Sequence, residues 1–217
     1  MSDTATTPTP ASNALVVGYV IAALGSILFS SKAVMIKLAY GVDEVDALTL
    51  ITLRMMFAVP IYVVIGAFVL QRKGGLGALP DGRGLISIIG IGLLGYYLAS
   101  FLDFRGLEYI TAQFERLILF TYPFFVMIFG ALFFGKPFRR YGLVALAIAY
   151  VGLAVIFVRG VETEGSVTII GALFVLGASI SFALYQLLAT GWVKRIGSQL
   201  FTCLGMSAAG CGAFVHY

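Results

Sequence analysis

The chain has 217 residues, of which 60% are hydrophobic and only 11% are charged, and its mean hydropathy is +1.03. Soluble domains average roughly 45–50% apolar and about 25% charged residues, so this composition excludes a soluble globular protein. The net charge of +4 does not indicate nucleic-acid binding, because the basic residues lie mostly in short loops between apolar stretches.

The first 14 residues are polar, rich in Thr, Pro and Ala, and free of Lys and Arg. A secretory signal needs a basic start and a short apolar core, so we expect residues 1–14 to form a short disordered cytoplasmic tail. Apolar stretches suited to membrane-spanning helices, which need about 20 residues, follow to the end of the chain. We predict an all-α membrane protein, a polytopic helical bundle of about seven transmembrane helices near 15–38, 47–70, 84–104, 111–134, 142–158, 167–190 and 198–217.

The orientation of these helices follows from the charges in the connections. The even-numbered connections are basic, whereas the first connection is acidic and the fifth is mixed. Basic loops stay in the cytoplasm, so we expect a multi-pass protein of the cytoplasmic (plasma or inner) membrane with its N-terminus inside. The basic residues in question are Arg72, Lys73 and Arg83, then Lys136, Arg139 and Arg140, and finally Lys194 and Arg195.

A short internal repeat links the first and sixth predicted helices. Ser26–Phe29 resembles Ser179–Phe182, and each follows a Leu-Gly pair. Five spans separate the two copies, so the second copy is inverted, as in many secondary transporters. We therefore expect a first five-helix repeat over 15–158 and an incomplete second repeat of two helices over 159–217. Because the chain ends at Tyr217 within an apolar run, we expect it to be truncated or part of a longer protein.

Several stretches, taken in order, resemble the EamA-type family of the drug/metabolite transporter superfamily. They are SILFSSKAVMIK, LTLITLRMMFAVP, GLEYITA, AQFERLILFTYPFFVMIFGALFFGKP and YGLVALAIAYVGLAVI, with Pro123 at the family's proline position. The resemblance implies ten helices in two inverted halves and transport of small metabolites. The chain departs from the family at Lys136, where members often carry an acidic residue, and it lacks the last three helices.

Charges inside a membrane are costly and are functional candidates by default. Lys32, Arg54, Asp103, Glu115 and Arg116 are all expected in the outer third of the bilayer. They could contact a substrate or a coupling proton, or they could only pair with one another and reach the interface. We expect Arg54 and Glu115 to form the core of this group.

Polar and aromatic residues at helical spacing complete the candidate site. Tyr96, Ser100 and Asp103 share one helical face, as do Glu115 and Tyr122, and as do Ala178, Ser181 and Tyr185. Such stripes could line a cavity for a polar molecule. The substrate-binding or coupling candidates are Lys32, Arg54, Tyr96, Asp103, Glu115, Arg116, Tyr122 and Tyr185.

These observations favour a secondary transporter, a permease or exporter of small metabolites that works by alternating access. The alternative is a non-transporting membrane fragment or subunit that needs a partner or the missing helices. A single histidine leaves no material for a catalytic triad or metal cluster, so we expect no enzyme activity, no metal and no cofactor. The expected partners are the lipid bilayer and a small molecule such as an amino acid or organic acid, without nucleic acid; a homodimer stays open.

Overall fold

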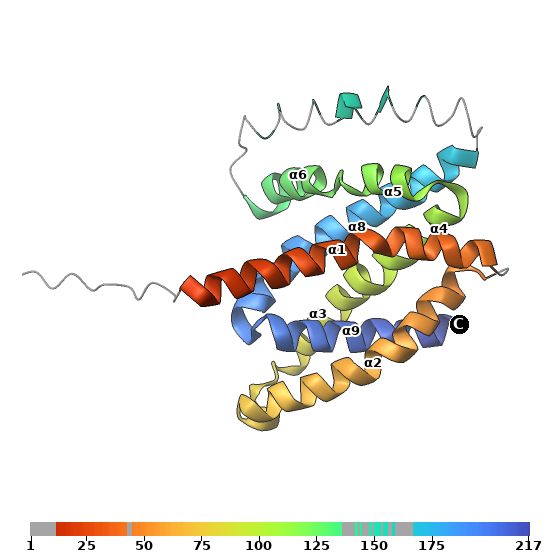
Figure 1. Ribbon diagram of the computed structural model, residues 1–217. Coiled ribbons are helices and arrows are strands. Elements are labelled where there is room, and N and C mark those ends of the chain that lie inside the picture. Colours follow the sequence, from red (N-terminus) through yellow and green to blue (C-terminus); the bar gives the residue numbers. More distant parts are fainter. Residues whose placement is uncertain are drawn as a thin grey trace, which may run out of the picture.

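The computed structural model describes residues 12–42, 45–135 and 167–217, together with scattered positions between 142 and 158. Over these residues all regular secondary structure is helical (Figure 1). Six of the predicted spans are present as helices long and apolar enough to cross a membrane, which confirms the polytopic all-α class; the predicted span 142–158 lies largely outside the described residues. The helices are α1 (Ser12–Val42), α2 (Ala47–Arg72), η1 (Gly75–Ala78), α3 (Gly82–Gly92), η2 (Leu93–Leu98), α4 (Ala99–Tyr109), α5 (Ala112–Leu119), α6 (Tyr122–Phe134), α8 (Val167–Ile196) and α9 (Ser198–His216).

The third span is longer than predicted. It runs without interruption through α3, η2 and α4 from Gly82 to Tyr109, so the predicted end at residue 104 is wrong by more than one turn. The charges of Asp103 and Arg105 resemble a loop in the sequence, but Asp103 is buried and paired within the bundle. The middle of the span, η2, is a π-helical turn, and Ser181 of α8 donates a 2.7 Å hydrogen bond to the Leu94 carbonyl there.

The fourth span is divided into α5 and α6. Pro123 stands in the first turn of α6, has no N–H, and cannot continue the helical hydrogen bonds of the preceding turn. The Ser179 hydroxyl oxygen of α8 lies 3.3 Å from the carbonyl oxygens of Ile118 and Leu119 and 3.1 Å from that of Val175, and its single proton is donated to one of them at a time. The helix is therefore broken at Pro123, and the Ser179 hydroxyl offers a donor to the Leu119 carbonyl, which the missing Pro123 N–H leaves without its helical partner.

Small residues let the central helices approach closely. A Cβ atom on Gly92 would lie 2.6 Å from Gly205 Cα, where α3 meets α9. A Cβ on Gly171 would lie 3.0 Å from the Gly106 carbonyl, where α8 crosses α4. Glycine at such crossings is typical of membrane bundles, in which packing replaces the hydrophobic effect as the driving force.

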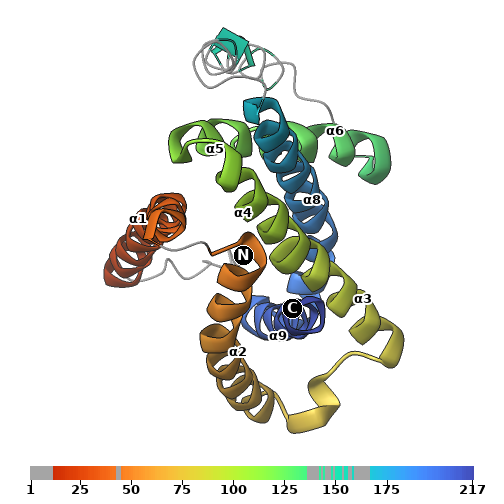
Figure 2. The same cartoon turned by 90° about the vertical axis from the view of Figure 1, so that its right-hand side faces the viewer.

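The arrangement leaves α1 at one side of the bundle (Figure 2). Its main contacts are with α4 and α5, while α2 packs along α9 and α4 packs along α8. Large apolar side chains such as Leu28 and Met35 are exposed on α1, as expected for a surface that faces lipid. Two half-buried lysines of α1 face α4: Lys32 pairs with Asp103, and Lys37 donates to the Leu107 carbonyl at 2.7 Å.

Candidate functional site

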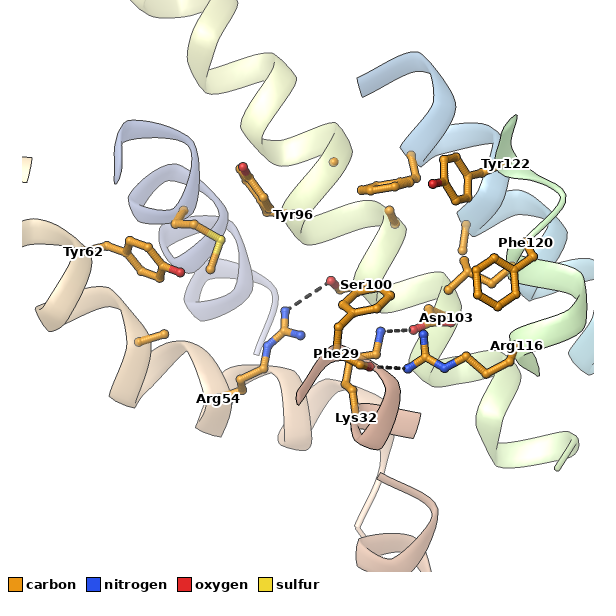
Figure 3. A pocket seen from close by; sticks show the side chains of 17 residues that line it. Phe29, Lys32, Arg54, Tyr62, Tyr96, Ser100, Asp103, Arg116, Phe120 and Tyr122 are labelled. Carbon is orange, nitrogen blue, oxygen red and sulfur yellow. Dashed lines mark hydrogen bonds and ion pairs between the residues drawn. The ribbon is translucent and has the colours of Figure 1, made fainter. Parts of the chain in front are cut away.

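A cavity of about 400 Å³ lies among α1, α2, η2, α4, α5, α6, α8 and α9 (Figure 3). Three cations line it, from Lys32, Arg54 and Arg116, together with one carboxylate, that of Asp103. Aromatic side chains form most of the remaining wall, namely Phe29, Tyr62, Tyr96, Phe120, Tyr122 and Phe182.

Lys32 and Asp103 form a buried ion pair at the centre of the lining. Lys32 Nζ lies 2.5 Å from Asp103 Oδ2, and the two side chains are 23% and 3% exposed. Lys32 lies ten residues before Val42, the end of α1, which is roughly 15 Å along the helix. Because α1 continues past the predicted end at residue 38, Lys32 lies farther from the helix end than predicted, and it pairs with Asp103 within the bundle.

Arg54 of α2 also lines the cavity. Its Nη2 donates to Ser100 Oγ at 3.2 Å, and its guanidinium carbon lies 5.2 Å from the centre of the Phe104 ring. Arg54 and Glu115, which we expected to form the core of the charged group, do not pair with each other: among the described residues, the ion pairs join Lys32 to Asp103, Arg105 to Glu108 and Arg116 to Glu115. Arg54 Nε is buried and has no hydrogen-bond partner in the described part of the chain.

Glu115 and Arg116 lie in the first turns of α5, which Thr111 caps by accepting a hydrogen bond from the Phe114 amide. Arg116 extends towards α1, where Nη2 donates to the Phe29 carbonyl at 2.8 Å and the guanidinium lies over the Phe29 ring. Glu115 points the other way into the protein: its side chain is 0% exposed, and its Oε2 lies 3.4 Å from Arg116 Nε. Glu115 therefore sits behind the cavity wall.

Three tyrosines take different places at the site. Tyr96 and Tyr122 line the cavity, and the Tyr122 ring meets Phe182 edge-on at 5.2 Å. Tyr185 lies behind them, with its hydroxyl 2.5 Å from that of Tyr96 and its ring stacked on Phe182. A Cβ atom at Gly95 would collide with the Tyr185 ring, so the glycine in the π-helical turn makes room for this contact.

The profile of the EamA-like transporter family matches residues 16–158, about two thirds of the chain. The chain belongs to the EamA-like transporter family. The uncharacterised transporter YcbK of Bacillus subtilis is 32% identical over 203 residues, which cover 92% of this chain and 62% of that protein. A second uncharacterised B. subtilis transporter, YvbV, is 31% identical over 108 residues, covering 50% of this chain and 33% of YvbV.

A WAT1-related protein of Arabidopsis thaliana is 27% identical over 198 residues, covering 77% of this chain and 54% of the plant protein. The EamA-like chain thus spans less than two thirds of the length of each of these relatives. No solved structure matches the chain. The family is one of membrane transporters, and its members are typically not enzymes.

The structure brings six of the eight candidate residues of this EamA-like chain to one cavity. Lys32, Arg54, Tyr96, Asp103, Arg116 and Tyr122 line it, whereas Glu115 and Tyr185 contact lining residues from behind. Sequence reasoning missed the phenylalanines of the cavity wall, above all Phe29 and Phe182. The internal repeat could have identified them, because Phe29 and Phe182 occupy the same position in its two copies.

Proposed function

We propose that this EamA-like chain takes part in secondary transport of a small metabolite that bears a carboxylate, and that the cavity is where the metabolite binds. The observation that carries the proposal is the Arg54 guanidinium. It lines the cavity and donates to a neutral oxygen, that of Ser100, and no carboxylate within the described ranges lies at ion-pair distance from it.

The charge balance of the cavity supports an anionic or zwitterionic substrate. Lys32 and Asp103 compensate each other at 2.5 Å, and Arg116 is engaged by the Phe29 carbonyl and approached by Glu115. An arginine at membrane depth needs a counter-charge or polar partners. A carboxylate fits the planar guanidinium of Arg54 through two parallel hydrogen bonds.

The walls of the cavity favour a substrate that is also partly apolar. Phe29, Phe120, Tyr122 and Phe182 present ring faces and edges to the space. A cavity of about 400 Å³ is within the range of small-molecule sites, roughly 300–1,000 Å³, which combine apolar walls with a few placed polar groups. An amino acid or an organic acid meets both requirements.

Transport by alternating access is supported by the way the cavity is closed at one end. The Tyr96–Tyr185 hydroxyl contact lies at the middle of the spans. Beyond it the packed side chains of Ile88, Leu200 and Phe201 fill the bundle. At the surface of the same end, Lys73 Nζ donates to the Ile196 carbonyl at 2.6 Å. Secondary transporters hold substrate near the membrane midplane and open to one side at a time.

We assign the closed end to the cytoplasm, because the basic residues of the second and sixth connections lie there. Arg72 and Lys73 follow α2, and Lys194 and Arg195 end α8. The positive-inside rule retains such loops in the cytoplasm. With this orientation the charged part of the cavity lies in the outer half of the membrane.

A ligand panel tests the proposed substrate class. Purified protein in lipid nanodiscs is titrated with the common amino acids and with a set of mono- and dicarboxylic acids, and each acid is paired with its amide. We expect binding to some acids and none to the matching amides, because an amide cannot place a charged oxygen at ion-pair distance from Arg54, and the described residues do not place one there either. Equal binding of acid and amide, or preference for organic cations, would refute the carboxylate assignment.

A further inference from the structure

Two carboxyl groups from neighbouring helices meet at the inner wall of the cavity. Asp103 of α4 is 2% exposed and Glu115 of α5 is 0% exposed. The two carboxyl groups are close enough to interact with each other. Asp103 faces the cavity, and Glu115 lies behind it.

In the described part of the chain, the hydrogen-bond donors near these two carboxyl groups leave three of the four carboxyl oxygens without a hydrogen bond. Lys32 donates to Asp103 Oδ2, and Arg116 donates through Nη2 to the Phe29 carbonyl. Arg116 Nε approaches Glu115 Oε2 at 3.4 Å but makes no hydrogen bond. Within the described residues, Asp103 Oδ1 and both oxygens of Glu115 are buried and receive no hydrogen bond from any donor.

An ionised Glu115 would be poorly stabilised in this position, because its charged partner Arg116 lies 3.4 Å away and donates no hydrogen bond to it. A buried carboxylate without hydrogen-bond donors is strongly disfavoured, and two ionised carboxyl groups in contact offer only acceptor lone pairs to each other and repel. A single proton supplies the missing hydrogen-bond donor and removes the charge repulsion, because the contact then becomes an O–H···O⁻ hydrogen bond between the two side chains.

We propose that Asp103 and Glu115 form a proton-binding site in which one proton is shared between their carboxyl groups, and, resting on the transport proposed above, that this proton is the coupling ion. The proton comes from water in the cavity, bonds to a carboxyl oxygen, and returns to water by the same route through Asp103. The charged groups that face the pair are Lys32 and Arg116, and Arg54 faces Asp103 from α2.

Protonation of the pair makes the cavity more positive by one charge. A carboxylate substrate therefore binds more tightly to the protonated form, and by linkage the proton binds more tightly when the substrate is present. Proton and substrate consequently move in the same direction. In this scheme Arg54 binds the substrate, and the Asp103–Glu115 pair sets the proton dependence of that binding.

Infrared difference spectroscopy tests the proton site directly. The purified chain in nanodiscs at neutral pH, without substrate, is expected to show the carbonyl stretch of a protonated carboxylic acid, shifted on exchange into D₂O. The Glu115→Gln variant should lose this band and still fold, because glutamine resembles the protonated acid. The matched control Glu108→Gln, whose carboxylate pairs with Arg105 outside the cavity, should keep the band.

Absence of the band in the unmodified protein overturns the proton site, whatever the folding of the variants. The same conclusion follows if Glu115→Gln folds and keeps the band. The coupling is tested by carboxylate affinity, which should rise as pH falls in the unmodified protein and be independent of pH in Glu115→Gln. A band without any carboxylate binding supports the proton site and refutes the proposed function.

Discussion

The ion pair between Lys32 and Asp103 provides the sharpest test of how the cavity is held together. Replacing Lys32 by Met removes the group that lies 2.5 Å from Asp103 Oδ2. The two partners differ in exposure, since Asp103 is 3% exposed and Lys32 is 23% exposed at the side chain. Water in the cavity can hydrate an unpaired ammonium but cannot reach an unpaired Asp103 to the same extent.

This difference sets the expected magnitudes. Removing one partner of a buried pair costs about 3–5 kcal/mol. Asp103 can limit the loss by taking up a proton, which for an ordinary carboxyl costs about 4 kcal/mol at neutral pH. We therefore expect Lys32→Met to lower the free energy of unfolding by about 3–4 kcal/mol. Asp103→Asn should lower it by about 1–2 kcal/mol, and the double variant should lie within about 1 kcal/mol of the unmodified protein.

Reversible unfolding in mixed micelles, followed by Trp192 fluorescence and circular dichroism, measures these differences as a double-mutant cycle. The pair of Arg105 and Glu108 is the matched control, because its side chains are 35% and 20% exposed and such pairs contribute about 1 kcal/mol or less. A coupling energy for Lys32 and Asp103 no larger than for the control would refute the reasoning.

Three further predictions address the scaffold and its orientation. Ser179→Ala should destabilise the protein by about 1–2 kcal/mol, measured by the same unfolding assay, because the Leu119 carbonyl, which Pro123 cannot serve, loses a donor; no change would contradict that role. Gly92→Ala should lower the free energy of unfolding by about 1–3 kcal/mol, because its Cβ would meet the α9 backbone. The control Gly90→Ala, whose Cβ meets nothing within 4 Å, should be neutral or stabilising. Equal effects of the two substitutions would argue against the close crossing of α3 and α9. A cysteine at Arg139 in a cysteine-free background should resist an impermeant reagent added outside intact cells, and labelling there would reverse the proposed topology.

The helices were predictable from the sequence because each span is a long apolar run, and a bilayer imposes that length on any helix that crosses it. The ends were less predictable. At the end of the third span, the charges of Asp103 and Arg105 have the composition of a loop, and only the partners supplied by Lys32 and Glu108 explain why the helix continues. Local composition cannot show a pairing between residues 71 positions apart.

The candidate site was predictable as a set of residues but not as a set of pairs. Counting along helices gives the depth of each charge, and equal depth suggested that Arg54 would meet Glu115. Depth does not fix the direction in which a side chain leaves its helix. In the structure Arg54 donates to Ser100, whereas Glu115 is fully buried behind the cavity lining, beside Arg116.

The carboxylate affinity of Arg54 variants tests the central claim most directly. An arginine–carboxylate hydrogen-bonded contact contributes about 1.5–3 kcal/mol, so Arg54→Gln should raise the Kd of the bound carboxylate about 10- to 100-fold. The matched variant Arg105→Gln, whose guanidinium pairs with Glu108 outside the cavity, should bind like the unmodified protein. If Arg54→Gln folds and binds the carboxylate with unchanged affinity, Arg54 is not the substrate's counter-charge and the proposed binding site is wrong.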